Sequence, residues 1–194
     1  MSLIIGLTGP TGSGKTTVSL AAKDLGFKII DCDEIARKAV EKGEEGLKAV
    51  VNAFGEDVLF EDGELNRKEL AQKAFSSPEK TELLNKTLLP YIVEKVKDEI
   101  TEDNLLLDAP TLFESGLDSI CKYTIAVLSD EKVRKMRIIN RDGLTETEAD
   151  LRMGAGKSDE FYLEKTGNII YNNGSPEELY DSATEILKKL LGGN

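Results

Sequence analysis

A glycine-rich stretch near the start of the chain carries the residues best suited to chemistry. It reads Gly9-Pro-Thr-Gly-Ser-Gly-Lys-Thr-Thr17. Glycines at this spacing let successive backbone N–H groups turn toward an anion, and a helix beginning at the lysine adds the positive end of its dipole. The lysine then reaches the outer phosphates of a nucleotide, and the threonine after it can bind Mg²⁺. The predicted phosphate-binding residues are Thr11, Gly12, Ser13, Gly14, Lys15, Thr16 and Thr17.

The flanks of this stretch fit a strand, a loop and a helix. Residues 3–7 form a short apolar run typical of a buried strand, and residues 18–25 have apolar side chains at helical spacing, with Gly26 as a C-terminal cap. One alternative is a glycine-rich turn with a surface lysine. Another is a dinucleotide-binding loop, but Thr17 stands where that motif needs its third glycine. The flanks favour a phosphate-binding loop.

The rest of the chain supplies elements that would complete an α/β fold. Apolar runs at 27–30, 104–107, 123–128 and 169–171 predict four further strands, and so a five-stranded parallel sheet flanked by helices. A final helix is predicted after Ser175, which begins a capping box with Glu178. The apolar side chains of that helix that should face the sheet are Leu179, Ala183, Ile186, Leu187 and Leu190, and Gly192 should end it.

Residues 42–101 show no parallel-strand pattern. Helices are predicted at 44–54, 67–75 and 78–100, the second capped by Asn66 and the third interrupted at Pro90, with a turn or hairpin at 58–63. Such a helical insertion is the natural place for an acceptor pocket, and a structural covering layer fits its residues equally well.

Three aspartates follow predicted strands. Asp31 and Asp33 should lie at the sheet edge that also carries the phosphate loop, since ligands gather at the carboxyl ends of parallel strands. Asp33 could equally be the N-cap of the helix predicted at 34–41, with Arg37 as its ion-pair partner one turn later. Asp108 ends a buried strand and could position Mg²⁺ through water. Cys32, between the first two aspartates, is expected to be partly buried.

A cationic helix face follows the fourth strand. Arg134, Arg137 and Arg141 are spaced by three and four residues, and like charges at that spacing repel, so an anion could lie opposite them. They could also form a solvated face relieved by nearby acids. The functional interpretation is a phosphate clamp made by Arg137 and Arg141. A second short helix begins with the capping pattern Thr145-x-x-Glu148, as expected of a mobile lid.

Composition narrows the classes of function. The chain has 194 residues, a net charge of −11, no histidine and two cysteines. Histidine catalysis is excluded, and the general basic footprint of a nucleic-acid-binding protein is missing. No apolar run approaches the length of a membrane span, and two cysteines suit a reducing compartment, so we expect a cytoplasmic protein with one core and small appendages.

Several sequence strings resemble motifs of the dephospho-coenzyme A kinase family and occur in the same order along the chain. Beside the phosphate loop they are Ile30-Asp-Cys-Asp-Glu-Ile-Ala-Arg37, Gly63-Glu-Leu-Asn-Arg67, Phe75-Ser-Ser-Pro78, Leu107-Asp-Ala-Pro-Thr-Leu-Phe-Glu-Ser-Gly116, Arg137-x-x-x-Arg141-Asp-Gly-Leu and Asn172-Asn-Gly-Ser175. The resemblance implies a P-loop NTPase core (1–41, 102–134 and 165–194), an acceptor-binding insertion (42–101) and a lid (about 135–164). It also implies that ATP, with Mg²⁺, phosphorylates the ribose 3′-hydroxyl of dephospho-coenzyme A.

The same resemblance implies roles for individual residues. Asp33 would accept or orient the hydroxyl proton, and Lys15 and Arg141 would stabilise the transferring group. The nucleotide would also contact Arg137, Asn172 and Gly174, and the metal would contact Thr16 and, through water, Asp108. The expected acceptor-binding residues are Thr8, Asp31, Asp33, Arg37, Arg67, Pro110, Leu112, Phe113 and Glu114. Small molecules would be the only partners, with no nucleic acid and no membrane, and the protein would be a monomer or a weak homo-oligomer.

Some positions depart from the family pattern. Leu89 replaces the histidine of a His-Pro pair, Thr111 replaces a leucine, Gly156 a glutamine, and Tyr162-Leu163 a Lys-Arg pair in the distal lid. Three alternative functions remain: a nucleoside-monophosphate or other small-molecule kinase, a GTPase-type switch, and a nucleotide-binding protein without activity. The switch is disfavoured because its base-reading Asn-Lys-x-Asp signature is absent.

Overall fold

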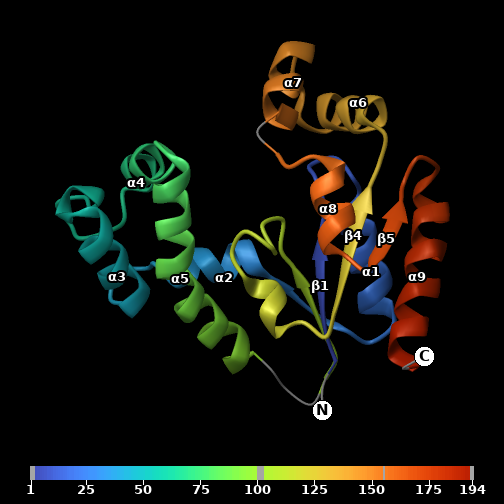
Figure 1. Cartoon of the computed structure of the whole chain (residues 1–194), viewed down its shortest axis with the longest axis horizontal. Helices are drawn as coiled ribbons and strands as arrows, with labels where there is room; N and C mark the ends of the chain where they lie inside the picture. The colour runs from blue at the N-terminus through green and yellow to red at the C-terminus, as the bar shows by residue number, and fades with distance from the viewer. Residues whose placement is uncertain (1–2, 100–102, 155, 193–194) are drawn as a thin grey trace. The chain divides into compact units, whose positions relative to one another are not determined.

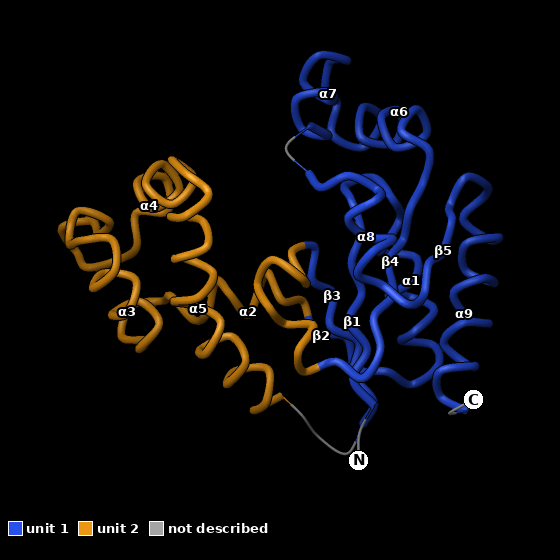
Figure 2. The backbone as a smooth tube through the Cα atoms, viewed as in Figure 1, with its two compact units in different colours: residues 1–30, 101–110, 121–194 blue, residues 31–100, 111–120 orange. Residues whose placement is uncertain are grey.

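The computed structural model describes residues 3–99, 103–154 and 156–192. The chain forms two compact units, which Figure 2 shows in different colours. Unit 1 comprises residues 1–30, 101–110 and 121–194, and unit 2 comprises residues 31–100 and 111–120. Within the described residues, none of the helices combines the length and the apolar character needed to cross a membrane.

Unit 1 is built on the predicted five-stranded parallel sheet (Figure 1). Its strands, in the spatial order β2-β3-β1-β4-β5, are β2 (Lys28–Asp31), β3 (Leu105–Asp108), β1 (Ile4–Thr8), β4 (Tyr123–Leu128) and β5 (Asn168–Tyr171). β1 is central, with Leu7 in register with Asp108 of β3 and Thr8 in register with Ala126 of β4. The central strand therefore brings the phosphate loop to the level at which β3 ends.

Two helices pack beside this sheet and share its core. In α1 (Lys15–Asp24) Val18, Ala21 and Ala22 are buried, and Gly26 follows its end with a φ of +85°, as the sequence predicts. In α9 (Pro176–Gly192) the predicted apolar face is buried, with Ile186 partly so. The capping box is confirmed, since Ser175 N–H donates to Glu178 Oε2 over 2.8 Å and Glu178 N–H donates to Ser175 Oγ over 3.2 Å.

Three more helices of unit 1 follow β4: α6 (Glu131–Asp142), α7 (Glu146–Gly154) and α8 (Asp159–Lys165). The predicted capping pattern opens α7, where Thr145 N–H donates to Glu148 Oε2 over 2.9 Å. α8 is not predicted by the sequence pattern. Tyr162, at a position where the family pattern has charge, is 3% exposed, so this residue packs inside the unit.

Unit 2 is helical. It contains α2 (Cys32–Lys38), α3 (Glu45–Phe54), α4 (Arg67–Ala74), α5 (Pro78–Asp98) and the short 3₁₀ turns η1 (Glu56–Val58) and η2 (Leu117–Ile120). Its core is made by Val40, Leu47, Val50, Val58, Leu65, Leu70 and Ala74. The predicted hairpin is confirmed by the antiparallel bridge between Leu59 and Leu65. Asn66 caps α4 as predicted, since its Oδ1 accepts from Glu69 N–H over 3.1 Å.

The prediction that the third helix of this unit is interrupted at Pro90 is wrong. α5 is continuous from Pro78 to Asp98 with Pro90 inside it. Proline removes one backbone hydrogen bond and crowds the carbonyl one turn earlier, which weakens a helix locally. Here Ile92 and Val96, one turn apart on one face, are buried beyond the proline, and their burial holds the second half of the helix. The predicted end at residue 100 lies outside the described residues.

Candidate active site

Two positions of the phosphate loop require glycine because other parts of the chain lie very close to them. Gly9 and Gly14 have φ values of +138° and +104°, in the region that L side chains rarely adopt. A Cβ at Gly9 would lie 2.3 Å from the carbonyl oxygen of Val127, and one at Gly14 would lie 2.3 Å from Asn172 Nδ2. β4 and the segment after β5 therefore press directly on the loop and fix its path.

The end of the loop carries hydrogen-bond donors in a region of positive electrostatic potential. α1 begins at Lys15, and no side chain caps its first turn, so the orphan N–H groups of a helix start face the loop interior. Lys15 Nζ donates to the carbonyl oxygen of Gly9 over 2.8 Å and lies 3.5 Å from that of Pro10. The ammonium group is thus held across the mouth of the loop, where an anion would meet it.

Asn172 links the loop to α6. Its Nδ2 donates to the carbonyl oxygen of Ser13 over 2.7 Å, and its Oδ1 accepts from Arg137 Nη2 over 3.1 Å. Arg137 also donates to the carbonyl oxygens of Asn172, over 3.1 Å, and Gly174, over 3.3 Å. The structure thus brings three predicted nucleotide-binding residues together, and their contacts make Arg137 a support for residues 172–174 as well as a nearby positive charge.

Two hydroxyl-bearing residues at this end of the sheet are not predicted as site residues by the sequence. Ser129, 2% exposed, donates to the carbonyl oxygen of Asn172 and accepts from Arg137 Nη1 over 3.2 Å. Ser19 Oγ donates to Asp108 Oδ2 over 3.1 Å. Ser19 lies one turn after Thr16, so the two residues share one face of α1. That three-residue spacing was the available signal for Ser19.

Asp31, and not Asp33, is the N-cap of α2, which corrects the prediction. Asp31 Oδ1 accepts from the N–H groups of Asp33, over 2.9 Å, and Glu34, over 3.0 Å. The reason is that β2 runs straight into the helix, which begins at Cys32, so the last extended residue takes the cap position. Asp33 lies in the first turn with an exposed side chain, and Cys32 is 4% exposed and more deeply buried than predicted.

Two predicted acceptor-binding arginines of unit 2, Arg37 and Arg67, lie near the C-terminal end of α2. Arg67 Nη2 donates to the carbonyl oxygen of Arg37 over 3.3 Å, and both side chains are exposed. Lys38 forms an ion pair with Glu34 over 2.7 Å, whereas Arg37 forms none with any residue that the structure describes. The structure therefore does not support the alternative in which Arg37 only forms an ion pair with Asp33.

The segment after β3 passes from unit 1 into unit 2. Thr8, fully buried, donates from Oγ1 to the carbonyl oxygen of Pro110 over 3.2 Å. Leu112 is also fully buried, whereas Phe113 and Glu114 are half-buried. Asn85 Nδ2 donates to the carbonyl oxygen of Glu114 over 3.0 Å. Carboxylate oxygen Oε2 of Glu114 is buried without a hydrogen-bond partner in the described part of the chain.

The three arginines of α6 each have a protein partner. Arg134 lies 3.6 Å from Asp159, and Arg137 binds residues 129, 172 and 174 as above. Arg141 donates from Nε and Nη2 to the two carboxylate oxygens of Asp142, over 2.7 and 2.8 Å. This hydrogen bonding lowers the pKa of Asp142 and raises the pKa of Arg141.

The predicted site residues divide between the two units. Unit 1 carries residues 11–17, Thr8, Asp108, Pro110, Arg137, Arg141, Asn172 and Gly174, and unit 2 carries Asp31, Asp33, Arg37, Arg67, Leu112, Phe113 and Glu114. Unit 1 therefore holds every predicted nucleotide and metal contact. Unit 2 holds Asp33 and most of the predicted acceptor contacts.

Comparison with known proteins gives one consistent result. A family model described as dephospho-CoA kinase matches residues 3–178. The dephospho-CoA kinase of Corynebacterium efficiens is 40% identical over 195 residues, covering 97% of this chain and 98% of the relative. That of Enterococcus faecalis is 35% identical over 197 residues, covering 99% of each chain.

A solved structure agrees with these sequence matches. The crystal structure of TT1252 from Thermus thermophilus has a TM-score of 0.77 and 29% identity, covering 97% of this chain and 98% of that one. The arrangement is that of P-loop NTPases, so the predicted fold class is confirmed. The chain belongs to the dephospho-CoA kinase family, and it is an ATP-dependent phosphotransferase.

Proposed function

We propose that this chain transfers the γ-phosphoryl group of ATP to the ribose 3′-hydroxyl of dephospho-coenzyme A. The observation that carries the proposal is a preformed phosphate loop, residues 9–17, in a member of this family. The 3′-oxygen forms a bond to the γ-phosphorus while the bond from phosphorus to the bridging oxygen breaks, so ADP leaves and the hydroxyl proton passes to a carboxylate. Positioning and charge stabilisation supply most of the catalysis in such transfers.

The phosphate loop holds the donor. Backbone N–H groups of residues 12–17 and the start of α1 bind the β- and γ-phosphates, and Lys15 exchanges its carbonyl partners at Gly9 and Pro10 for phosphate oxygens. Because Asn172 and Val127 fix the loop, it binds without rearranging its backbone, which lowers the entropic cost of binding. Backbone groups at Asn172 and Gly174 contact the adenine side of the nucleotide.

The side chains beside the loop fit Mg²⁺. Thr16 offers a hydroxyl oxygen and Asp108 a carboxylate, and the hydrogen bond from Ser19 to Asp108 holds that carboxylate toward α1. Hard oxygen ligands of this kind, few in number and supplemented by water and phosphate, suit Mg²⁺. When bound, the ion neutralises charge on the β- and γ-phosphates. Thr16 would ligate it directly and Asp108 through water.

Asp33 accepts or orients the proton of the 3′-hydroxyl. Its backbone N–H is satisfied by Asp31, so the cap of α2 is independent of the Asp33 carboxylate. Asp33 lies in the first turn of the helix, and its side chain is exposed. A carboxylate at its ordinary acidity suffices, since the attacking oxygen loses its proton as the bond to phosphorus forms.

Arginines and the segment after β3 hold the acceptor. Arg37 and Arg67 bind it with exposed guanidinium groups, and that of Arg67 is held near α2 by its hydrogen bond to the backbone carbonyl of Arg37. Pro110, Phe113 and Glu114 contact it, and the orphaned Oε2 of Glu114 accepts from one of its donors. Thr8 and Leu112, both buried, act by holding this segment in place, and Asp31 acts by holding α2.

Arg141 stabilises the transferring group. It is bound to Asp142, which also accepts from Arg152 Nη1 over 2.7 Å. With two cations sharing one carboxylate, Arg141 can turn to a phosphoryl group while Arg152 keeps Asp142 neutralised. Because Arg141 changes partner in this way, the three-helix segment α6 to α8 would move as a lid.

The first experiment measures phosphate transfer by the purified protein with ATP and Mg²⁺. The acceptors are dephospho-coenzyme A, a panel of nucleoside monophosphates, or none, and product mass is read by mass spectrometry. We expect one added phosphate on dephospho-coenzyme A alone, and loss of turnover in Lys15→Ala. Turnover on a monophosphate, or ATP binding without transfer to any acceptor, would overturn the proposal.

We also infer a cytoplasmic enzyme that works as a monomer or weak homo-oligomer. Two cysteines without a disulfide, Cys32 and Cys121, suit a reducing compartment. Light scattering of the purified protein across a concentration series, with and without ATP, tests the oligomeric state. A stable dimer at low concentration would contradict it.

A further inference from the structure

A buried serine lies at the junction of β4 and α6, and none of the roles proposed above uses it. Ser129 is placed between Leu128, the last residue of β4, and Asp130, the N-cap of α6. Figure 1 shows β5 beside β4 at this junction, and the chain continues from β5 into residues 172–174. Ser129 is 2% exposed, so its hydroxyl depends on protein groups for its hydrogen bonds.

This hydroxyl both donates and accepts a hydrogen bond. Ser129 Oγ donates to the carbonyl oxygen of Asn172 and accepts from Arg137 Nη1 over 3.2 Å. Asn173 Oδ1 lies 3.3 Å from the same hydroxyl, but it already accepts from the N–H of Asp130 over 2.7 Å. A hydroxyl has one proton to donate, and the shorter contact, to Asn172, takes it. The serine therefore joins the turn after β5 to the guanidinium group of α6.

The guanidinium group of Arg137 is committed to this junction. Its two terminal nitrogens carry four N–H groups, and they make four contacts: with Ser129 Oγ, with Asn172 Oδ1, and with the carbonyl oxygens of Asn172 and Gly174. The pair of nitrogens with which a guanidinium usually binds a phosphate is therefore occupied. This arrangement favours a role in which Arg137 holds residues 172–174 over one in which it binds a phosphate directly.

These contacts continue to the phosphate loop. Arg137 Nη2 donates to Oδ1 of Asn172, which directs Nδ2 of the same amide to the carbonyl oxygen of Ser13, 2.7 Å away. Asn172 is 5% exposed, and a Cβ at Gly14 would lie 2.3 Å from that Nδ2. With so little space around the amide, a rotation of it would displace the backbone of the loop. A continuous series of side-chain contacts thus connects Ser129 to the anion-binding backbone.

We propose that Ser129 is a positioning residue for ATP. It is too deeply buried to touch the nucleotide, and it acts by holding Arg137 in the orientation that keeps the Asn172 amide on the phosphate loop. The inference rests on the proposed function and deepens it, since it adds a residue that sets the affinity of the donor site. Most of the predicted acceptor contacts belong to unit 2, so the effect of Ser129 should be confined to ATP.

The test removes the hydroxyl and measures ATP binding directly. In Ser129→Ala the carbonyl of Asn172 keeps Arg137 Nη1 as a donor, so we expect the variant to fold. Calorimetry with ATP and Mg²⁺, without an acceptor, should show Kd for ATP raised about threefold to tenfold, as for the loss of one hydrogen bond. At saturating ATP, kcat and KM for dephospho-coenzyme A should stay within about twofold of wild type. Ser129→Thr, which keeps the hydroxyl, should bind ATP more tightly than Ser129→Ala.

Tyr180→Phe is the matched control. Tyr180 donates from its hydroxyl to Asp24 Oδ2 over 2.7 Å, so this variant also removes a hydroxyl hydrogen bond of unit 1, at the end of α1 away from the loop. It should leave Kd for ATP unchanged. If Ser129→Ala lowered Tm but kept the wild-type Kd, the serine would be a structural residue and the inference would be overturned. Equal losses of affinity for ATP and for the acceptor would overturn it as well.

A double-variant cycle tests whether Ser129 acts through Arg137. Arg137→Lys keeps the charge but cannot make the four contacts, so it should itself raise Kd for ATP. In that background Ser129→Ala should add little, because the contact that it removes is already lost. Effects on Kd that multiply would show that the two residues act independently and would overturn the inference. Failure of the wild-type protein to phosphorylate dephospho-coenzyme A would instead defeat the proposed function, and Kd for ATP would still decide the role of Ser129.

Discussion

The phosphate loop of unit 1 and helix α2 of unit 2 both carry residues proposed to act on substrate, and they are fixed in different ways. The loop is held at the site itself: Asn172, 5% exposed, binds the carbonyl of Ser13 and leaves no room for a side chain at Gly14. α2 is held elsewhere, by its Asp31 cap and by the buried Cys32 and Ile35.

This difference predicts that substitutions in the loop change stability and activity together, whereas substitutions in α2 can change one without the other. The same contacts that give the loop its anion-binding shape also contribute to the core of unit 1, so a change there should cost both. In α2 the proposed reactive side chains are exposed and the contacts that stabilise the helix belong to their neighbours. A change to a reactive side chain there should cost activity alone.

The strongest test of this comparison is Gly14→Ala. The added Cβ would meet Asn172 Nδ2 at 2.3 Å, on a backbone at φ +104°, so the loop must shift. We expect kcat/KM to fall by at least about 10²-fold, as for other 1 Å misplacements. Strain of about 1–3 kcal/mol should also lower Tm by several degrees. Steady-state kinetics and thermal unfolding measure the two effects.

Gly26→Ala is the control for that variant. Gly26 has a similar positive φ of +85°, but its Cβ would meet no atom within 4 Å. It should lower Tm modestly and leave kcat/KM unchanged. If Gly14→Ala kept wild-type kinetics while losing stability, the loop would not couple the two properties.

Asp33→Asn should give the opposite result, a loss of activity at constant stability. Removal of the proposed base or orienting carboxylate should lower kcat by about 10²–10⁴-fold. Tm should stay the same, because Asp31 caps the helix. Asp31→Ala is the counterpart, with an expected loss of about 1 kcal/mol from the missing cap. A lower Tm with kcat retained in Asp33→Asn would reverse the two roles.

Asn172→Ala should have an intermediate effect on both properties. It removes the donor to Ser13 and leaves buried polar groups without partners, which costs about 1–3 kcal/mol. At about 2–4 °C of Tm per kcal/mol for a chain of this size, the loss is measurable by thermal unfolding. KM for ATP should rise several-fold as the loop loosens.

Asn168→Ala is the matched comparison for Asn172→Ala. Asn168 begins β5, whereas Asn172 directly follows the end of that strand, and Asn168 Nδ2 donates to the carbonyl oxygen of Thr124 over 3.1 Å. This variant should lower Tm slightly without changing KM for ATP. Equal KM values in the two variants would show that Asn172 is only a structural residue.

The smallest effect concerns the pH dependence of the ion pair between Arg141 and Asp142. Arg141 lowers the pKa of Asp142 in the folded state, so this interaction stabilises the fold above the unfolded pKa, about 3.9 for an aspartate, and the stabilisation is lost as pH falls through the folded value. The Tm difference between wild type and Asp142→Asn should therefore shrink between pH 6 and pH 3. A difference that stays constant would mean that the pair contributes nothing through charge.

Periodicity and capping patterns predicted most of the architecture because their causes are local. The five strands, both complete capping boxes and the Asn66 cap depend on residues within a few positions of one another. The two errors also arise because sequence patterns report only local interactions. The sequence predicts an interruption at Pro90 because it does not show that burial of Ile92 and Val96 holds the helix together. It leaves Asp33 open as a cap because it does not specify that α2 begins at Cys32.

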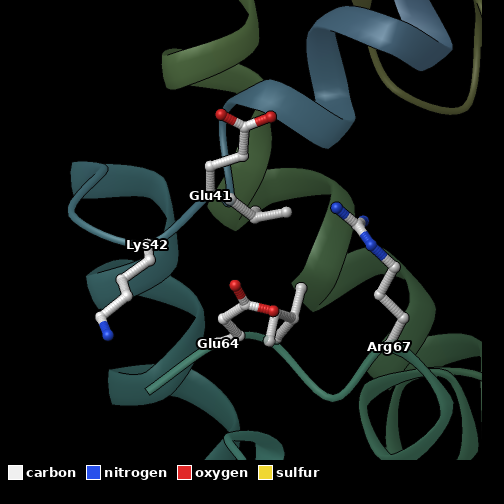
Figure 3. Close-up of a pocket in the computed structure, with 6 residues that line it drawn as sticks. Glu41, Lys42, Glu64 and Arg67 are labelled. Carbon is white, nitrogen blue, oxygen red and sulfur yellow. The ribbon is translucent and has the colours of Figure 1, made fainter. Parts of the chain in front are cut away.

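The site was predictable in its residue types but not in its contacts. The phosphate loop is recognisable because each position has a chemical reason, whereas the partners of Arg137 are backbone carbonyls that no sequence pattern specifies. The hydrogen bond from Ser19 to Asp108 spans 89 positions, and that from Asn172 to Ser13 spans 159. A pocket of unit 2 likewise draws its lining from residues 40–42, which follow α2, and from residues 64, 65 and 67 around the start of α4 (Figure 3).

The central position of β1 has a consequence for synthesis on the ribosome. β1 is complete by residue 8, but its partners begin at Leu105 and Tyr123, so the strand leaves the exit tunnel long before either neighbour exists. Most of unit 2 lies in the intervening sequence and is helical, and local helical contacts form faster than pairing across a long loop. An apolar strand that is exposed before its sheet can form is prone to aggregate or to pair with the wrong partner. The nascent chain should therefore depend on chaperone capture, or on slow translation past residue 128, more than its modest length suggests.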